Sequence, residues 1–148
     1  MIDDCGKNPM RWDCNKGGAG MNCFNKKRRP KIEIFAECFP GLISFGDIDG
    51  IVEINGQGLL LEWKSDLMNL PRGQYIMYRN LTTTGYLSVI VVIGNAETME
   101  ISHMGQFYLG SETPLKEATI DDVKDKIKWW VDGALKRVHT EIIRGLIG

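Results

Sequence analysis

The chain is poor in the features that mark membrane and secreted proteins. None of its segments reaches the roughly 18 apolar residues that a membrane-spanning helix needs. Its first residues, MIDDCGKNPM, are polar and lack the apolar core of a signal peptide. We therefore expect a cytoplasmic protein, in which structural disulfide bonds are rare.

The cysteines and histidines also lack the spacing of familiar sites. Cys5, Cys14 and Cys23 recur every nine residues and Cys38 follows, without the short Cys-x-x-Cys pairs of zinc sites. We favour free thiols, with a structural zinc site as the alternative. The chain has only two histidines, and neither lies near a cysteine in sequence, which argues against a cysteine nucleophile.

The net charge is too small to indicate a partner. The sequence has 18 basic and 19 acidic residues, for a formal charge of −1 at pH 7. The basic residues are unevenly placed, however, because five of them lie within six positions: Lys26, Lys27, Arg28, Arg29 and Lys31. This basic cluster on an otherwise acidic chain either contacts a polyanion or is simply solvated.

Composition and periodicity divide the chain into an arm and a domain. We interpret residues 1–28 as an irregular arm rich in cysteine, glycine and lysine, and residues 29–148 as one domain. The predicted elements are helices over 30–39, 69–81 and from Thr119 onward, and strands over 42–45, 49–54, 59–63, 87–93 and 98–103. This order predicts an α/β or α+β domain with a small mixed β-sheet flanked by helices.

Charged side chains accompany two apolar strands of a predicted hairpin. Asp49 opens the first strand, whereas Glu62 and Lys64 close the second and share one face. The predicted turn over residues 55–58 brings the two ends together. Converging carboxylates favour Mg²⁺ or Mn²⁺, and a neighbouring lysine can stabilise developing negative charge. Phosphodiester hydrolysis is the chemistry that follows, with a solvated cross-strand ion pair as the alternative.

The pattern Asp49…Glu62-Trp63-Lys64 resembles the PD-(D/E)xK nuclease superfamily. This resemblance implies a restriction-endonuclease-like core and hydrolysis of DNA phosphodiester bonds with Mg²⁺ or Mn²⁺. It assigns metal binding to Asp49 and Glu62, and assistance to the attacking water to Lys64. Asp47 is a rival to Asp49. Ile48 stands where the family name has proline, a position that varies among members.

A second motif is similar to the RecB-like branch of this superfamily. Gln74 and Tyr78, in GQYIMY, match its Gln-x-x-x-Tyr motif and share one face of a predicted helix. The resemblance implies that both assist catalysis and DNA binding. It also implies an acid on the preceding helix, for which Glu37 is the candidate and Glu33 the second choice. All four cysteines precede Glu62, so the iron–sulfur cluster of some members is not supported.

Three functions remain open at this point. The chain also loosely resembles bacteriophage or prophage proteins, which implies the cytoplasm of a bacterial host. DNA is the expected partner, a homodimer is compatible with the family, and phage or host recombination or replication proteins are further candidates. The alternatives are a non-catalytic nucleic-acid-binding protein on the same fold, and a phage adaptor or inhibitor of a host protein. An exposed tryptophan of the pair Trp129-Trp130 is able to stack on a base, although packing is the simpler interpretation.

Overall fold

The structure, a computed structural model, describes residues 30, 32–66 and 70–147; the side chains of Glu33 and of residues 138–147 are left out. The chain divides into two compact units, residues 1–46 and 47–148, and each is described by itself. The predicted arm and the basic cluster at residues 26–31 lie outside the described residues. Among the described residues, no helix is both long and apolar enough to cross a membrane.

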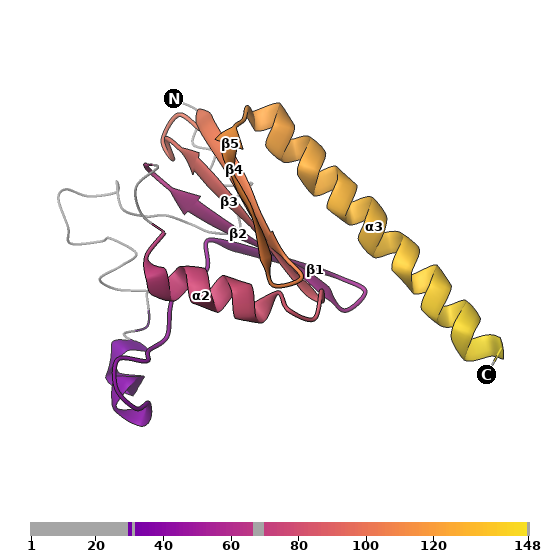
Figure 1. Cartoon of the computed structure of the whole chain (residues 1–148), viewed down its shortest axis with the longest axis horizontal. Helices are drawn as coiled ribbons and strands as arrows, with labels where there is room; N and C mark the ends of the chain where they lie inside the picture. Colours follow the sequence, from indigo (N-terminus) through magenta and orange to yellow (C-terminus); the bar gives the residue numbers. More distant parts are fainter. Residues whose placement is uncertain (1–29, 31, 67–69, 148) are drawn as a thin grey trace. The chain divides into compact units, whose positions relative to one another are not determined.

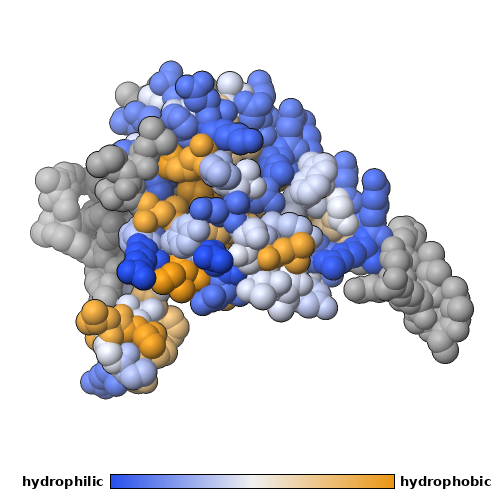
Figure 2. Space-filling view, viewed as in Figure 1, coloured by the Kyte–Doolittle hydropathy of each residue, from blue (hydrophilic) through white to orange (hydrophobic). Residues whose placement is uncertain are grey.

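The first unit contains the 3₁₀ helix η2 (Ile32–Cys38), inside the helix predicted over 30–39. The strand predicted over 42–45 is wrong, because these residues form no regular structure. Gly41 turns the chain with a φ of 62°, and no other strand of this unit is described with which residues 42–45 could pair. The surface of the described part of the first unit, residues 30 and 32–46, is largely apolar (Figure 2). Its exposed apolar side chains are Ile34, Phe35, Leu42, Ile43 and Phe45.

The second unit is a mixed α/β domain built on one five-stranded sheet. Its strands are β1 (Gly50–Ile54), β2 (Gln57–Lys64), β3 (Leu87–Gly94), β4 (Ile101–Tyr108) and β5 (Ser111–Glu117). They lie in sequence order, and only β2 and β3 run parallel. The connection between these two strands carries α2 (Arg72–Leu81), as a parallel pair requires a crossover. The long helix α3 (Ile120–Ile147) follows β5. The mixed sheet that the sequence predicts is confirmed.

Helices α2 and α3 cover opposite faces of this sheet (Figure 1). Successive side chains of β2 and β3 alternate between the two faces, and β3 is buried on both, as its continuous apolar run predicts. The α2 face packs Leu60, Val89, Val91, Ile93 and Phe107 against Tyr78. The α3 face packs Leu59, Ile90 and Val92 against Val123, Trp130 and Ala134. The three residues of α3 recur at helical spacing, so one apolar stripe of this helix covers the sheet.

The hairpin turn is shorter than predicted. Asn55 and Gly56 alone form it, with φ values of 55° and 80°, whereas Gln57 and Gly58 already belong to β2. Two consecutive residues with positive φ are typical of a two-residue hairpin turn whose twist matches the flanking strands. This shorter turn changes which residues of β1 and β2 lie opposite each other.

The other differences concern the ends of elements and one strand. Helix α2 begins at Arg72 after Pro71, and β4 extends to Tyr108. The sequence prediction has no counterpart of β5. All of its residues are exposed, and its SETPLKE sequence contains a proline. Such a strand shows no burial periodicity, and proline is tolerated because β5 lies at the edge of the sheet.

Candidate active site

Asp49 and Glu62 lie opposite each other across the β1–β2 hairpin. The last paired residues are Gly50 and Leu61, so one further step along the antiparallel register joins positions 49 and 62. Asp49 Oδ2 accepts a hydrogen bond of 2.6 Å from the backbone N–H of Trp63. The two-residue turn therefore places Asp49 across from Glu62, rather than near Lys64 as the predicted four-residue turn implied.

Glu62 is a buried acid on the α2 face of the sheet. It follows Leu60 on this face by strand alternation, and only 5% of its surface is exposed. Lys64 is next on the same face, and its Nζ lies 2.8 Å from Glu62 Oε1. A buried carboxylate needs such compensation, because removing a charge from water is costly unless it is paired and hydrogen-bonded.

Helix α2 supplies two further donors to the same carboxylate. Tyr78 donates its hydroxyl proton to Glu62 Oε2 at 2.6 Å, and Gln74 Nε2 donates to Oε1 at 3.4 Å. Both residues reach Glu62 because positions four apart lie on one face of a helix. The structure thus brings together Asp49, Glu62, Lys64, Gln74 and Tyr78, which we call the Glu62 cluster.

Tyr78 remains a proton donor throughout the neutral range. Burial raises the pKa of its hydroxyl, and the hydrogen bond to Glu62 and the negative charges of Glu62 and Asp49 raise it further. The ring is fixed by packing against Phe107, with a centroid distance of 5.6 Å. The last turn of α2 is held in turn by the buried hydroxyl of Thr82, which donates to the Tyr78 carbonyl at 2.7 Å. Glu62 therefore has a fixed orientation.

Two oxygen atoms near this carboxylate are not explained by packing. Within the described part of the chain, the buried Oε1 of Gln74 has no hydrogen-bond partner. The Trp63 carbonyl points to the same side of β2 as its N–H, that is toward Asp49, beyond the point where β1 begins. No side-chain motif indicates this main-chain oxygen, although strand alternation and the correct turn length together reveal it.

The oxygen ligands of the cluster fit Mg²⁺ or Mn²⁺. Mg²⁺ is usually bound by one or two carboxylates, with water and substrate phosphate filling its remaining positions. Asp49 and Glu62 supply two carboxylates, and Gln74 Oε1 is a buried oxygen without a partner in the described structure. Among the residues described, no group of three or more histidine, cysteine or acidic side chains is suited to a metal. A site built on two carboxylates is therefore suited to a hydrated, substrate-sharing ion.

The remaining candidates do not join the cluster in the described structure. Glu37 is exposed and belongs to the first unit, whose position relative to the sheet is not described. Asp47 is exposed, and Asp49 is the acid that bonds to β2. Cys38 is an exposed free thiol. The other three cysteines and the basic residues Lys26, Lys27, Arg28, Arg29 and Lys31 lie outside the described residues.

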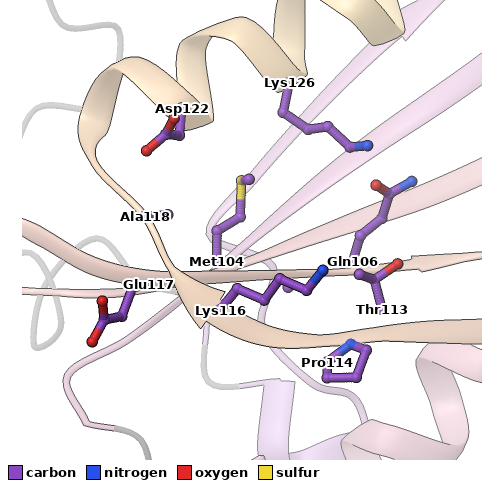
Figure 3. Close-up of a pocket in the computed structure, with 10 residues that line it drawn as sticks. Met104, Gln106, Thr113, Pro114, Lys116, Glu117, Ala118, Asp122 and Lys126 are labelled. Atoms are coloured by element: carbon purple, nitrogen blue, oxygen red, sulfur yellow. The ribbon is translucent and has the colours of Figure 1, made fainter.

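A cavity of about 260 Å³ lies elsewhere, between β4, β5 and the start of α3 (Figure 3). Its walls include Met104, Lys116 and Lys126, but no member of the Glu62 cluster.

Neither a family model, nor a curated protein, nor a solved structure matches this chain. We therefore infer the function from the chemistry of the described residues.

Proposed function

We propose that this protein is a metal-dependent nuclease that hydrolyses DNA phosphodiester bonds, on a restriction-endonuclease-like core. The observation that carries the proposal is the buried carboxylate of Glu62, held between Lys64, Gln74 and Tyr78 and lying opposite Asp49. This arrangement joins two potential metal ligands with an ammonium group at the end of a rigid strand.

Packing alone does not account for the Glu62 cluster. An ion pair that is removed from water gains little net stability, and apolar residues of similar volume often replace it without loss. Glu62 directly follows Leu59-Leu60-Leu61, so a further apolar residue would continue the core. Gln74 Oε1, which has no hydrogen-bond partner among the described residues, is a second buried group that is costly without a ligand. These costs support a functional role for the cluster.

Each residue has a distinct role in the proposed reaction. Asp49 and Glu62 would hold Mg²⁺ or Mn²⁺, with the Trp63 carbonyl as a further oxygen on the same side. When bound, the ion polarises a phosphoryl oxygen and lowers the pKa of a coordinated water. Lys64, which contacts Glu62 at 2.8 Å, places its positive charge where negative charge develops during attack on phosphorus. Tyr78 and Gln74 orient Glu62 through their hydrogen bonds.

Cleavage assays test this function directly. Labelled single-stranded, duplex and branched DNA would each be incubated with the protein in Mg²⁺, in Mn²⁺ and in EDTA. We expect metal-dependent products that disappear in Glu62→Gln, a nearly isosteric change. Glu97→Gln is the matched control, because Glu97 is an exposed acid that lies outside the Glu62 cluster. The pattern of products would also distinguish cleavage at ends from cleavage within a strand.

The other outcomes are equally informative. Cleavage that survives in Glu62→Gln would disprove the assignment of the site. Folded protein that binds DNA without cutting it in any metal would favour a non-catalytic nucleic-acid-binding protein. Absence of both binding and cleavage would leave the adaptor or inhibitor function.

A further inference from the structure

A second cavity, of about 220 Å³, lies beneath α3, on the face of the sheet opposite to the Glu62 cluster. Its floor comes from the strands, through Gln57 of β2, Ser88 of β3 and Gln106 of β4. Its wall comes from α3, through Trp129 and Arg137 among others. None of these residues belongs to the Glu62 cluster, which lies on the α2 face.

The floor of this cavity is polar where the rest of the face is apolar. Gln57 and Ser88 alternate with residues of the other face, so they continue the rows that hold Leu59, Ile90 and Val92. Only 9% of Gln57 and 3% of Ser88 is exposed. Within the described part of the chain, neither side chain has a hydrogen-bond partner. Among the described residues, only Gln74 Oε1 is both fully buried and without a partner, so the polar atoms of Gln57 and Ser88 reach the cavity, where a ligand can bond to them.

The wall of the cavity is aromatic and open to solvent. Trp129 is 62% exposed, whereas the neighbouring Trp130 is packed into the core. Tyr108 also lines the cavity and is partly exposed. Amide groups recognise the edges of nucleobases, and exposed aromatic rings stack on their faces. The combination of a polar floor and an aromatic wall is therefore suited to a planar heterocycle.

Cationic side chains lie immediately beside this cavity. The cavity of Figure 3 shares Gln106 with it, and Lys126 Nζ lies 4.5 Å from the centroid of the Trp129 ring. In Figure 3 the ammonium groups of Lys116 and Lys126 extend to the side on which Gln106 and Thr113 lie. The acids Glu117 and Asp122 lie at the other end, where Asp122 bonds to Thr119. An anion is therefore favoured at the lysine end.

We propose that these two neighbouring cavities, which share Gln106 as a lining residue and are here called the α3 groove, bind a nucleotide. The base enters the cavity of Gln57, Ser88 and Trp129, and its phosphate contacts Lys116 and Lys126. The ligand is either a free mononucleotide or one residue of a single strand, since both present the same base and phosphate. A base inside a duplex is stacked and paired, so it does not reach this cavity. The proposal does not depend on the nuclease function.

The sharpest test fills the cavity at Gly133, which lines it from α3. A Cβ built at this position meets no atom within 4 Å, so a side chain can enter the cavity without moving the backbone. Gly133→Phe would occupy the space of the base, and Gly133→Ala is the matched control that adds only a methyl group. Binding of mononucleotides and of a short labelled oligothymidine would be measured in EDTA, which prevents metal-dependent cleavage.

We expect Gly133→Ala to bind like the wild type and Gly133→Phe to lose binding. If mononucleotides bind, the groove is a small-molecule site; if only the oligonucleotide binds, it is a single-strand site. Equal affinity of the two variants would overturn the proposal. So would the failure of folded wild-type protein to bind either ligand. Circular dichroism of both variants establishes that they are folded.

Two further variants separate the base from the phosphate. Trp129→Ala should weaken binding on the order of tenfold, through loss of stacking. Lys126→Ala should weaken binding most at low salt, whereas Lys128→Ala should have no effect, because Lys128 is an exposed residue of α3 that lines neither cavity. Unchanged affinity in Trp129→Ala would contradict the proposed position of the base.

Discussion

The two faces of the sheet differ in whether their buried polar side chains have hydrogen-bond partners. On the α2 face, Glu62 is surrounded by donors from Lys64, Gln74 and Tyr78. On the α3 face, Gln57 and Ser88 are also buried but have no partner within the described structure. Strand β2 contributes to both faces, so the difference does not come from the element itself.

This difference distinguishes two uses of buried polarity. A carboxylate held by three donors is orientated before any ligand arrives, as a catalytic group needs to be. Amide and hydroxyl groups that face a cavity without a protein partner remain available to bond to a ligand. The α2 face therefore has the organisation of a reaction site, and the α3 face that of a recognition site.

Catalysis on the α2 face should be the property most sensitive to mutation. Lys64→Met retains most of the side-chain volume but removes the charge that contacts Glu62. We expect cleavage to fall on the order of 100- to 1,000-fold, which is typical when a group that stabilises developing charge is lost. Lys128→Met, at an exposed position of α3, is the control for the loss of one positive charge.

Binding measurements make this prediction specific. Because Lys64 acts on the reacting phosphate, the Lys64→Met variant should still bind nucleotides through the α3 groove in EDTA. Cleavage at the wild-type rate by the folded variant would remove Lys64 from the proposed mechanism.

The next prediction compares one hydroxyl group from each face. Tyr78→Phe removes a donor to the buried Glu62, so we expect the free energy of unfolding to fall by about 1.5 to 3 kcal/mol. Ser88→Ala removes a hydroxyl with no partner in the described chain, so the change should be smaller than about 0.5 kcal/mol. Denaturant titration of both variants measures the difference. Equal losses of unfolding free energy would mean that the hydrogen bond of Tyr78 does not distinguish it from Ser88 in stability.

The stabilising contribution of the Tyr78 hydroxyl depends on pH. Burial and the nearby carboxylates raise the pKa of Tyr78 above its ordinary value of 10.0. The folded chain therefore retains this proton to higher pH than the unfolded chain does. Its contribution to stability is complete below pH 10 and is lost as pH rises further, with a limiting slope of about 1.4 kcal/mol per pH unit.

Two tyrosine variants isolate this contribution from the titration of lysines. Unfolding free energies would be measured between pH 9 and pH 11 for the wild type, Tyr78→Phe and Tyr86→Phe. Tyr86 is largely exposed, so its variant should lose stability with pH as the wild type does. The curve for Tyr78→Phe should be flatter. Parallel curves for all three proteins would show that folding does not raise the pKa of the Tyr78 hydroxyl.

Local patterns in the sequence were sufficient to predict much of this arrangement. The apolar run of β3, the helical spacing of Gln74 and Tyr78, and the Glu62–Lys64 alternation each depend on a few neighbouring residues. These patterns predict the mixed sheet and the shared faces, whereas the expectation that Gln74 and Tyr78 lie at the site of Glu62 came from the resemblance of the motifs. The residue that lies opposite Asp49 depends on the length of the turn. The sequence predicts a turn of four residues, whereas the structure has one of two.

Features that depend on distant pairing could not be predicted in this way. Gln57 falls within the turn predicted over residues 55–58, and Ser88 belongs to an apolar run, so neither indicates a polar cavity. Only the pairing of β2, β3 and β4 beneath α3 brings Gln57, Ser88 and Gln106 into the floor of one cavity. Likewise, β5 gains its structure from pairing with β4 rather than from its own exposed and charged sequence.

The smallest expected effect concerns how the two helices are anchored. Helix α2 begins after Pro71 without a side-chain cap, and its position depends on its packing and on the Glu62 cluster. Helix α3 begins with reciprocal bonds between Thr119 and Asp122, in which Asp122 accepts from the Thr119 N–H at 2.6 Å and Thr119 Oγ1 accepts from the Asp122 N–H at 3.3 Å. Thr119→Ala should therefore cost about 1 kcal/mol of unfolding free energy.

The carboxylate of this cap makes the contribution dependent on pH. The hydrogen bonds from the Thr119 backbone and hydroxyl lower the pKa of Asp122 below its ordinary value of 3.8. Its contribution is therefore present above that value and is lost as pH falls through the lower pKa of the folded chain. The difference in unfolding free energy between wild type and Asp122→Ala should be constant from pH 7 to pH 5 and should shrink below pH 4. A difference that persists at pH 2 would show that the charged form of Asp122 does not stabilise the helix, and that α3 is held only by the core beneath it.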